Sequence, residues 1–244
     1  MRALIVSDVH SNLEAFQAVI DDAETRGPVD EIWSLGDLIG YGPDPSAVVD
    51  ILMGRPHRAV AGNHDLASVG KISLDDFNPY ASEANSWTSG QLSFEQAKFI
   101  EDQELRLEFD EFTLVHGSPR DPVWEYVVSQ QTALASFRHF DTFWCLLGHS
   151  HIPFICHPTS EEEVTFVEFP LDEEQPLNSD RLIINPGSVG QPRDGDPRAS
   201  FAIYDSDPSS IVHHRVEYDI RATQDKMRAV NLPVVLVERL SAGQ

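Results

Sequence analysis

Residues suited to metal chemistry gather in five short clusters, and each cluster directly follows an apolar run. The clusters are Ser7-Asp8-Val9-His10, Gly36-Asp37, Gly62-Asn63-His64-Asp65, His116-Gly117 and Gly148-His149-Ser150-His151. The apolar runs, such as residues 3–6 and 143–147, predict short buried strands. Because open α/β sheets place ligands at the carboxyl ends of their strands, the pattern predicts an α/β fold with one site at that edge.

The segment His149-Ser150-His151 has the densest chemistry. Side chains at positions i and i+2 of an extended backbone point the same way, so we expect both imidazoles to face one cavity. An isolated His-x-His more often combines a core histidine with a surface one. Here Asp8 and His10 repeat the same spacing at another strand end. We therefore interpret both pairs as ligands.

Length and composition narrow the class of protein. The chain of 244 residues shows no linker or repeat, so we expect a single domain, 1–244. With 40 acidic and 17 basic residues its formal charge is −23, which repels phosphate backbones and argues against duplex nucleic acid as a partner. No apolar stretch resembles a signal peptide or reaches the ~20 residues of a membrane span, so we expect no membrane partner and a cytoplasmic location. Cys145 and Cys156 form no disulfide framework. The sequence indicates no oligomeric state.

The order of the expected elements predicts the architecture. Ser11-Asn12-Leu13-Glu14 matches a capping box, and Asp44-Pro45 opens a second helix. Helices are expected after these signals, at 79–103 with Ser93–Gln96 as another capping box, and at 130–139, 219–230 and 234–241. Strands are expected at 3–6, 32–35, 58–61, 112–115, 143–147, 164–168, 182–185, 200–205 and 210–217. Strand–helix alternation followed mostly by strands predicts an α/β fold of two packed mixed β-sheets flanked by α-helices.

The strand-end residues form a donor set of seven candidate ligands. They are Asp8, His10, Asp37, Asn63, His116, His149 and His151. Oxygen and nitrogen donors without thiolate suit Mn, Fe, Co, Ni or Zn better than Ca or a structural zinc. Seven ligands exceed the needs of one tetrahedral ion but suit two ions that share a carboxylate. Two such ions, roughly 3.5–4 Å apart, clamp a phosphoryl group and activate water.

The ordered set of clusters resembles the signature of the calcineurin-like metallophosphoesterase superfamily over about residues 4–190. The loop Asn185-Pro186-Gly187-Ser188-Val189-Gly190-Gln191-Pro192-Arg193 resembles that of its small bacterial phosphodiesterase branch. The resemblance implies a metallophosphoesterase-type α/β sandwich with two divalent transition-metal ions, manganese first among the candidates. It also implies that Asp8, His10 and His151 hold one ion and that Asn63, His116 and His149 hold the other. Asp37 would bridge the two.

The resemblance also implies a mechanism. A metal-bound hydroxide would attack phosphorus, and His64 would stabilise charge and protonate the leaving oxygen, a contribution typically worth about 10²–10⁴-fold. Two roles are open to Asp65: it would orient His64 or cap the following helix. The protein serine/threonine phosphatase branch carries an Asp three residues after the bridging Asp, where this chain has Gly40. This difference argues against a protein phosphatase and leaves the partner of His64 open.

Three further residues are candidates for substrate binding, each with a structural alternative. Asn12 would contact a phosphate oxygen or cap the first helix, and Tyr41 would line the pocket or pack on a turn. Arg193 would pair with a phosphate bidentately or lie in solvent. We expect a dinuclear metal-dependent phosphoesterase that hydrolyses small phosphodiesters, with a small phosphorylated substrate as its partner. The alternatives are a phosphomonoesterase with the same site and an inactive scaffold, although relatives that lose activity usually lose ligands that this chain keeps.

Overall fold

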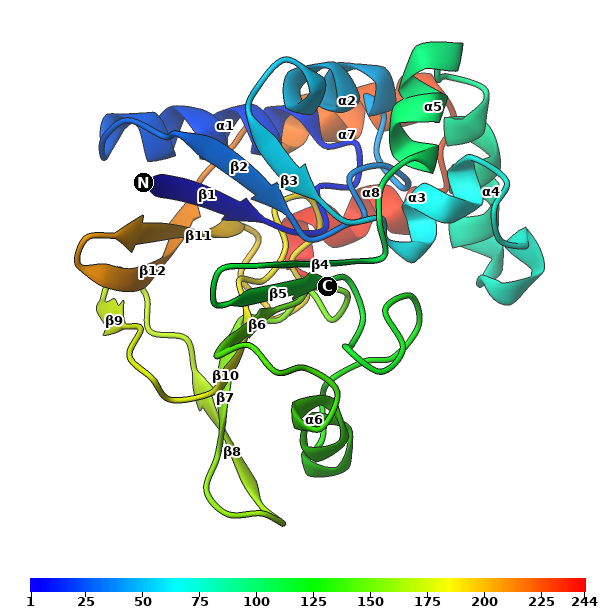
Figure 1. Cartoon of the computed structure of the whole chain (residues 1–244). Coiled ribbons are helices and arrows are strands. Elements are labelled where there is room, and N and C mark those ends of the chain that lie inside the picture. Colours follow the sequence, from blue (N-terminus) through cyan, green and yellow to red (C-terminus); the bar gives the residue numbers. More distant parts are fainter.

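A computed structural model describes all 244 residues and contains two six-stranded sheets that face each other (Figure 1). The first sheet has the order β3 (His57–Ala59), β2 (Glu31–Ser34), β1 (Arg2–Val6), β11 (Ala199–Ser206), β12 (Ser209–Val216) and β9 (Glu174–Pro176). The second has the order β4 (Arg106–Phe109), β5 (Phe112–Val115), β6 (Trp144–Leu146), β10 (Leu182–Asn185), β7 (Phe154–Pro158) and β8 (Val164–Glu168).

Each sheet combines a parallel group with antiparallel neighbours. Strands β1, β2 and β3 run parallel in the first sheet, as β5, β6 and β10 do in the second. The other pairs, including β1 with β11 and β10 with β7, are antiparallel. The predicted α/β architecture of two mixed sheets is therefore confirmed. The carboxyl ends of the two parallel groups carry all five polar clusters.

Helices cover the outer faces of the sheets. They are α1 (Leu13–Thr25), α2 (Pro45–Met53), α3 (Asn63–Ser68), α4 (Pro79–Ser89), α5 (Phe94–Glu101), α6 (Gln130–Phe137), α7 (Ile220–Ala229) and α8 (Val234–Ala242), with a short 3₁₀ turn at Leu74–Asp76. In Figure 1, α1, α2 and α7 lie over the first sheet, while α6 lies beside the second. None of these helices is long and apolar enough to cross a bilayer.

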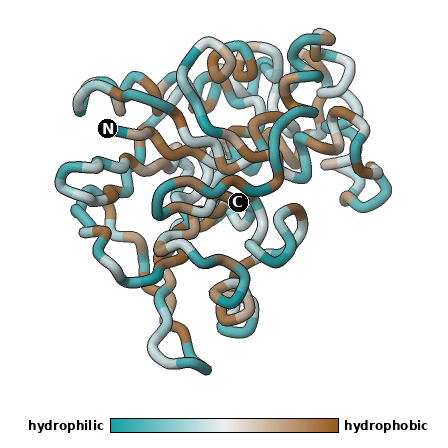
Figure 2. Tube along the Cα trace, viewed as in Figure 1, coloured by the Kyte–Doolittle hydropathy of each residue, from teal (hydrophilic) through white to brown (hydrophobic).

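The two-residue period of the strands divides the core into layers. Ala3 and Ile5 of β1 face the second sheet, whereas Leu4 and Val6 face the helices. Between the sheets the buried indole of Trp33 meets aromatic rings from both sides, such as that of Phe112 at 4.8 Å. Figure 2 shows hydrophobic stretches through this centre and a hydrophilic tip at the β7–β8 hairpin.

Several local predictions are wrong at helix ends. The stretch 79–103 is helical on both sides of an interruption at Gly90, which separates α4 from α5, and the predicted capping box Ser93–Gln96 begins α5. The cap of α1 is Asn12 and not Ser11, since the Asn12 side chain accepts from the Ala15 N–H at 3.2 Å. Asp44 precedes α2 but makes no capping hydrogen bond, because its carboxylate pairs with Lys226 at 2.9 Å. The short strands β4, β7 and β9 were not predicted, and the short helix α3 was anticipated only through the capping role open to Asp65.

Candidate metal centre and active site

The seven predicted ligands converge where the carboxyl ends of the two parallel groups meet. Each has an exposed fraction of 4 % or less. Their donor atoms form two compact groups, within each of which the atoms lie no more than 4.8 Å apart. One group contains Asp8, His10 and His151, and the other contains Asp37, His116 and His149.

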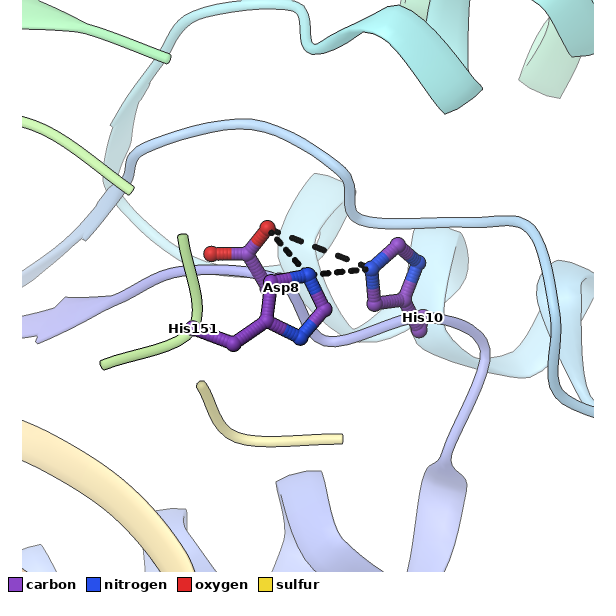
Figure 3. Close-up of side chains that lie close together, drawn as sticks. All are labelled: Asp8, His10 and His151. Carbon is purple, nitrogen blue, oxygen red and sulfur yellow. Dashed lines mark hydrogen bonds and ion pairs between the residues drawn. The ribbon is translucent and has the colours of Figure 1, made fainter. Parts of the chain in front are cut away.

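The first group is held around one free carboxylate oxygen (Figure 3). Asp8 Oδ1 lies 3.2 Å from His151 Nε2 and 3.9 Å from His10 Nε2. The other oxygen, Oδ2, accepts hydrogen bonds from Ser7 Oγ at 2.6 Å and from the His149 N–H at 3.1 Å. Oδ1 itself is buried and has no hydrogen-bond donor. This orphaned oxygen and the two ring nitrogens point at the same small volume, as a cation site requires.

The second group includes Asn63 as well. His116 Nε2 lies 3.0 Å from His149 Nδ1, 3.1 Å from Asn63 Oδ1 and 3.3 Å from Asp37 Oδ2. The same Asp37 oxygen is 3.8 Å from His10 Nε2 in the first group. Asp37 therefore stands between the two groups, where a bridging ligand would have to lie.

In each of the four ligand histidines, one ring nitrogen faces a backbone carbonyl and the other faces the ligand group. The contact with the carbonyl decides which of the two nitrogens carries the proton. His116 Nδ1 and His151 Nδ1 contact the Leu35 and Gln191 carbonyls at 2.8 and 2.6 Å. His10 Nδ1 and His149 Nε2 contact other carbonyls at 3.3 Å. A carbonyl only accepts, so in the neutral imidazole the nitrogen facing each group carries a lone pair. Lone pairs 3.0–3.2 Å apart repel each other unless a cation or proton lies between them. The residues therefore fit two bound metal ions.

The charges of the site agree with this fit. Burial lowers the pKa of His149 to about 3, which keeps its imidazole neutral. Burial opposes ionisation of Asp37, but His116 and His64 outweigh it and hold the Asp37 pKa well below its usual range. Burial likewise opposes protonation of His116, yet Asp37 overcomes it and raises the His116 pKa to about 9. Without metal, the centre thus holds a proton that a bound cation would displace.

The backbone of the site is unusual. Five of the seven candidate ligands have positive φ angles: Asp8 at 53°, His10 at 50°, Asp37 at 51°, His149 at 65° and His151 at 60°. This region is uncommon for residues other than glycine, and such strain concentrates at functional sites. The expectation that His149 and His151 project the same way from an extended strand is wrong, because both are left-handed. They enter different groups.

His64 lies beside the ligands at the start of α3, and its N–H donates to Asp37 Oδ1 at 2.8 Å. Its ring partner is Asn85 of α4, whose Oδ1 lies 3.0 Å from His64 Nδ1. Asp65 does not orient His64, because its two oxygens accept from the Ile39 and Gly62 N–H groups at 3.0 Å and cap the helix.

Asn85 was not among the predicted site residues, although Gly40 indicates the space that its side chain fills. A Cβ on Gly40 would lie 2.7 Å from both Asn85 Oδ1 and His64 Nδ1. Gly40 has φ +90° as well, so no other residue suits that position. The side chain of Asn85 therefore occupies the space that a carboxylate side chain at position 40 would need.

The three residues predicted to bind substrate differ in whether their polar groups are free to contact a ligand. Asn12 is buried, and its amide donates to the Gly190 carbonyl at 3.0 Å and to the Tyr218 hydroxyl at 3.2 Å. Of its two predicted roles the structure supports the helix cap and leaves no donor for a phosphate. Tyr41 packs its ring against His64 at 4.2 Å and His10 at 4.6 Å. Arg193 is half-buried, and its guanidinium donates to Gln191 Oε1 at 3.0 Å.

Aromatic side chains surround the ligands. Tyr126 stacks on the His149 ring at 3.8 Å, and Phe77 lies edge-on to His64 at 5.1 Å. The Trp124 ring lies 5.2 Å from the Phe77 ring. The rings of Phe77, Trp124 and Tyr126 form a partly exposed aromatic rim. A separate cavity of about 680 Å³ is lined by Ser150 and residues of β7 and β8 but by none of the seven ligands.

Residues 1–209 match the family model of the calcineurin-like phosphoesterase superfamily domain. The chain belongs to this superfamily. The membership confirms the resemblance inferred from the five clusters and makes the protein a hydrolase of the phosphoesterase superfamily.

Known proteins similar to this phosphoesterase differ in sequence identity and in how much of the chain they cover. The crystal structure of a metallophosphoesterase from Sphaerobacter thermophilus has 46% identity and a TM-score of 0.90, covering 100% of this chain and 99% of that one. An uncharacterized protein of Methanocaldococcus jannaschii is 38% identical over 98% of this chain and 97% of its own length. A symmetrical bis(5'-nucleosyl)-tetraphosphatase of Vibrio cholerae is 27% identical over 54% of this chain and 50% of its own length.

Proposed function

We propose that this phosphoesterase hydrolyses small phosphodiesters at a centre of two divalent transition-metal ions. The observation that carries the proposal is the pair of adjoining ligand groups with Asp37 between them and His64 beside them. The buried oxygen of Asp8 that lacks a donor and the inward lone pairs of the histidines support bound cations at both groups.

The ligands divide between the two positions by distance. Asp8, His10 and His151 would hold one ion; Asn63, His116 and His149 would hold the other; Asp37 would contact both. When bound, such ions supply the Lewis acidity that activates water and neutralises phosphoryl charge. The family resemblance makes manganese the first candidate, and Fe, Co, Ni or Zn suit the same oxygen and nitrogen donors.

His64 would act on the leaving oxygen. Its Nδ1 faces Asn85, so Nε2 is the atom left for substrate. Burial lowers the His64 pKa to about 4 despite the opposing effect of Asp37, so the ring is neutral in the empty site near pH 7. A substrate phosphate beside Nε2 brings the negative charge that favours the protonated ring. Arg193 would pair with a phosphate oxygen, and Tyr41 would hold the His64 ring in place by packing.

Asn85 is expected to position His64. Asn85→Ala removes the acceptor of one buried hydrogen bond, typically worth about 0.5–1.5 kcal/mol, so we expect kcat to fall by about 2- to 15-fold. The bound metal and KM should change little, since Asn85 touches neither ligand group. Asn85→Asp restores an acceptor and should recover part of the rate. Steady-state kinetics with metal analysis check this, and an unchanged kcat in a folded Asn85→Ala protein would show that the contact has no catalytic role.

Three features favour diesters over phosphoproteins. Gly40 replaces the Asp of the protein phosphatase branch, and the 185–193 loop resembles that of small phosphodiesterases. The aromatic rim suits an aryl or nucleoside group better than a serine peptide. The Vibrio cholerae protein that is similar to part of this chain is named a bis(5'-nucleosyl)-tetraphosphatase, a name that describes a nucleoside-containing substrate.

Substrate class can be tested directly. We expect bis-nitrophenyl phosphate to be cleaved faster than nitrophenyl phosphate, and both faster than a phosphoserine peptide, by protein reconstituted with each candidate ion in turn. A preference for nitrophenyl phosphate would instead establish a monoesterase. Absence of turnover with every ion, in protein that binds two, would establish an inactive scaffold.

A further inference from the structure

Two arginines lie side by side next to the ligand groups and share one acceptor. Arg193 Nη2 and Arg239 Nη1 donate to the same amide oxygen, Gln191 Oε1, at 3.0 and 3.3 Å. Both side chains are half-buried, and the Nε of each is buried without any hydrogen-bond partner. Arg239 comes from the last turn of α8, so the pair joins the loop after β10 to the carboxyl-terminal helix.

This pairing is exceptional in so acidic a chain. Acidic residues outnumber basic ones by 40 to 17, and most Lys and Arg side chains make an ion pair with a carboxylate. The exceptions are Arg138, Arg181, Arg193 and Arg239. Arg138 is exposed, and Arg181 lies 4.3 Å above the Phe140 ring. Only Arg193 and Arg239 place two like charges against a single neutral acceptor, an arrangement that an anion would stabilise.

The pair is connected directly to the candidate centre. The side chain of Gln191 accepts hydrogen bonds from both guanidinium groups. The backbone carbonyl of Gln191 accepts one from His151 Nδ1 at 2.6 Å. The backbone N–H of Arg193 also donates to the His151 carbonyl at 3.4 Å. Arg239 lies on α8, and this helix packs Leu236 and Leu240 into the same buried cluster as Tyr41, the ring that packs on His64 and His10. The two positive charges thus begin at the ligand groups and continue toward α8.

We propose that Arg193 and Arg239 form an anion subsite that holds a second phosphate of the substrate, beside the phosphodiester that is cleaved. The inference rests on the proposed function and narrows it. A simple diester carries one negative charge, which Arg193 alone would match, whereas the second adjacent guanidinium matches a further anionic group. Planar guanidinium forks bind phosphate oxygens in pairs. The expected substrates are therefore small nucleoside-type phosphodiesters or phosphoric anhydrides that carry an additional phosphate.

A matched pair of substrates tests the subsite. The probes are a deoxydinucleotide with a 5'-phosphate and the same dinucleotide without it, so that the cleaved bond is identical. We expect the metal-loaded wild type to favour the phosphorylated form in kcat/KM by roughly ten- to hundredfold, the range of a charge-assisted hydrogen bond. Arg239→Gln should lose most of that preference, and Arg239→Lys should keep part of it. Arg138→Gln, an equally unpaired but exposed arginine, should retain the whole preference.

A binding measurement separates the subsite from the proposed activity. Isothermal titration calorimetry would follow inorganic pyrophosphate binding to metal-free protein. We expect Arg239→Gln to weaken this binding by about tenfold and Arg138→Gln to leave it unchanged. Pyrophosphate binding that depends on Arg239 supports the subsite even if no dinucleotide is cleaved. The inference is overturned if wild-type protein does not bind pyrophosphate, if Arg239→Gln binds it normally with an unchanged melting temperature, or if Arg239→Gln lowers kcat/KM equally for both dinucleotides.

Discussion

Asp37→Ala is expected to empty both metal positions and to lower turnover by about 10³-fold or more. The same Asp37 oxygen lies 3.3 Å from His116 Nε2 and 3.8 Å from His10 Nε2, in different ligand groups. Removing it therefore takes a ligand from both proposed ions. Metal ions stabilise phosphoryl-transfer transition states by several kcal/mol, and each 1.36 kcal/mol changes the rate about tenfold.

Elemental analysis of purified protein and steady-state kinetics on bis-nitrophenyl phosphate measure these two losses. Wild-type protein should carry close to two transition-metal ions per chain and should lose its activity on chelation. Asp102→Ala is the matched control, because Asp102 is an exposed carboxylate at the carboxyl-terminal cap of α5, outside both ligand groups. An Asp37→Ala protein with two ions and normal turnover would remove Asp37 from the bridging position, and full activity of metal-free wild type would remove the metals from the mechanism.

The position of the ligands was predictable because it follows from strand order. Parallel strands bring their carboxyl ends to one edge, and the residues after β1, β2 and β3 follow that rule without any detailed geometry. Packing the second sheet against the first adds the residues after β5 and β6. The apolar alternation of the strands, such as Ala3 and Ile5 against Leu4 and Val6, is a local property, so the two-sheet core was predictable as well.

The partners of these residues were not predictable, because they come from elements far away in the chain. Asn85 lies 21 residues from His64 on a helix whose packing no local pattern specifies. Arg239 lies 48 residues from Gln191, on the last helix, and looks like an ordinary charge on a helix. The family resemblance implied the division of His149 and His151 between two groups, but the left-handed backbone angles that produce it are not revealed by a run such as Gly148–His151. Tertiary packing, and not local propensity, decides such contacts.

His64→Gln is expected to keep both metals and the fold, yet to lower kcat on an alkyl phosphodiester by roughly the 10²–10⁴-fold of a lost general acid. Its neighbour Asn63 is directed at His116 Nε2, at 3.1 Å, whereas the His64 ring turns to Asn85. The two adjacent residues thus serve different tasks, one in the second ligand group and one outside both groups.

The leaving group distinguishes an acid from a packed side chain. A nitrophenolate leaves without much protonation, so its ester should lose much less rate in His64→Gln than the alkyl ester does. If His64 were only packed against Tyr41 and Phe77, its replacement would lower the melting temperature and leave the turnover of folded protein near normal on both esters. His139→Gln, a change at an exposed histidine just past the carboxyl-terminal end of α6, is the control for both measurements. An equal loss on both esters would show that His64 stabilises phosphoryl charge without donating a proton. Loss of one ion from folded His64→Gln protein would instead place His64 among the ligands or their direct supports, and the division of the site would have to be redrawn.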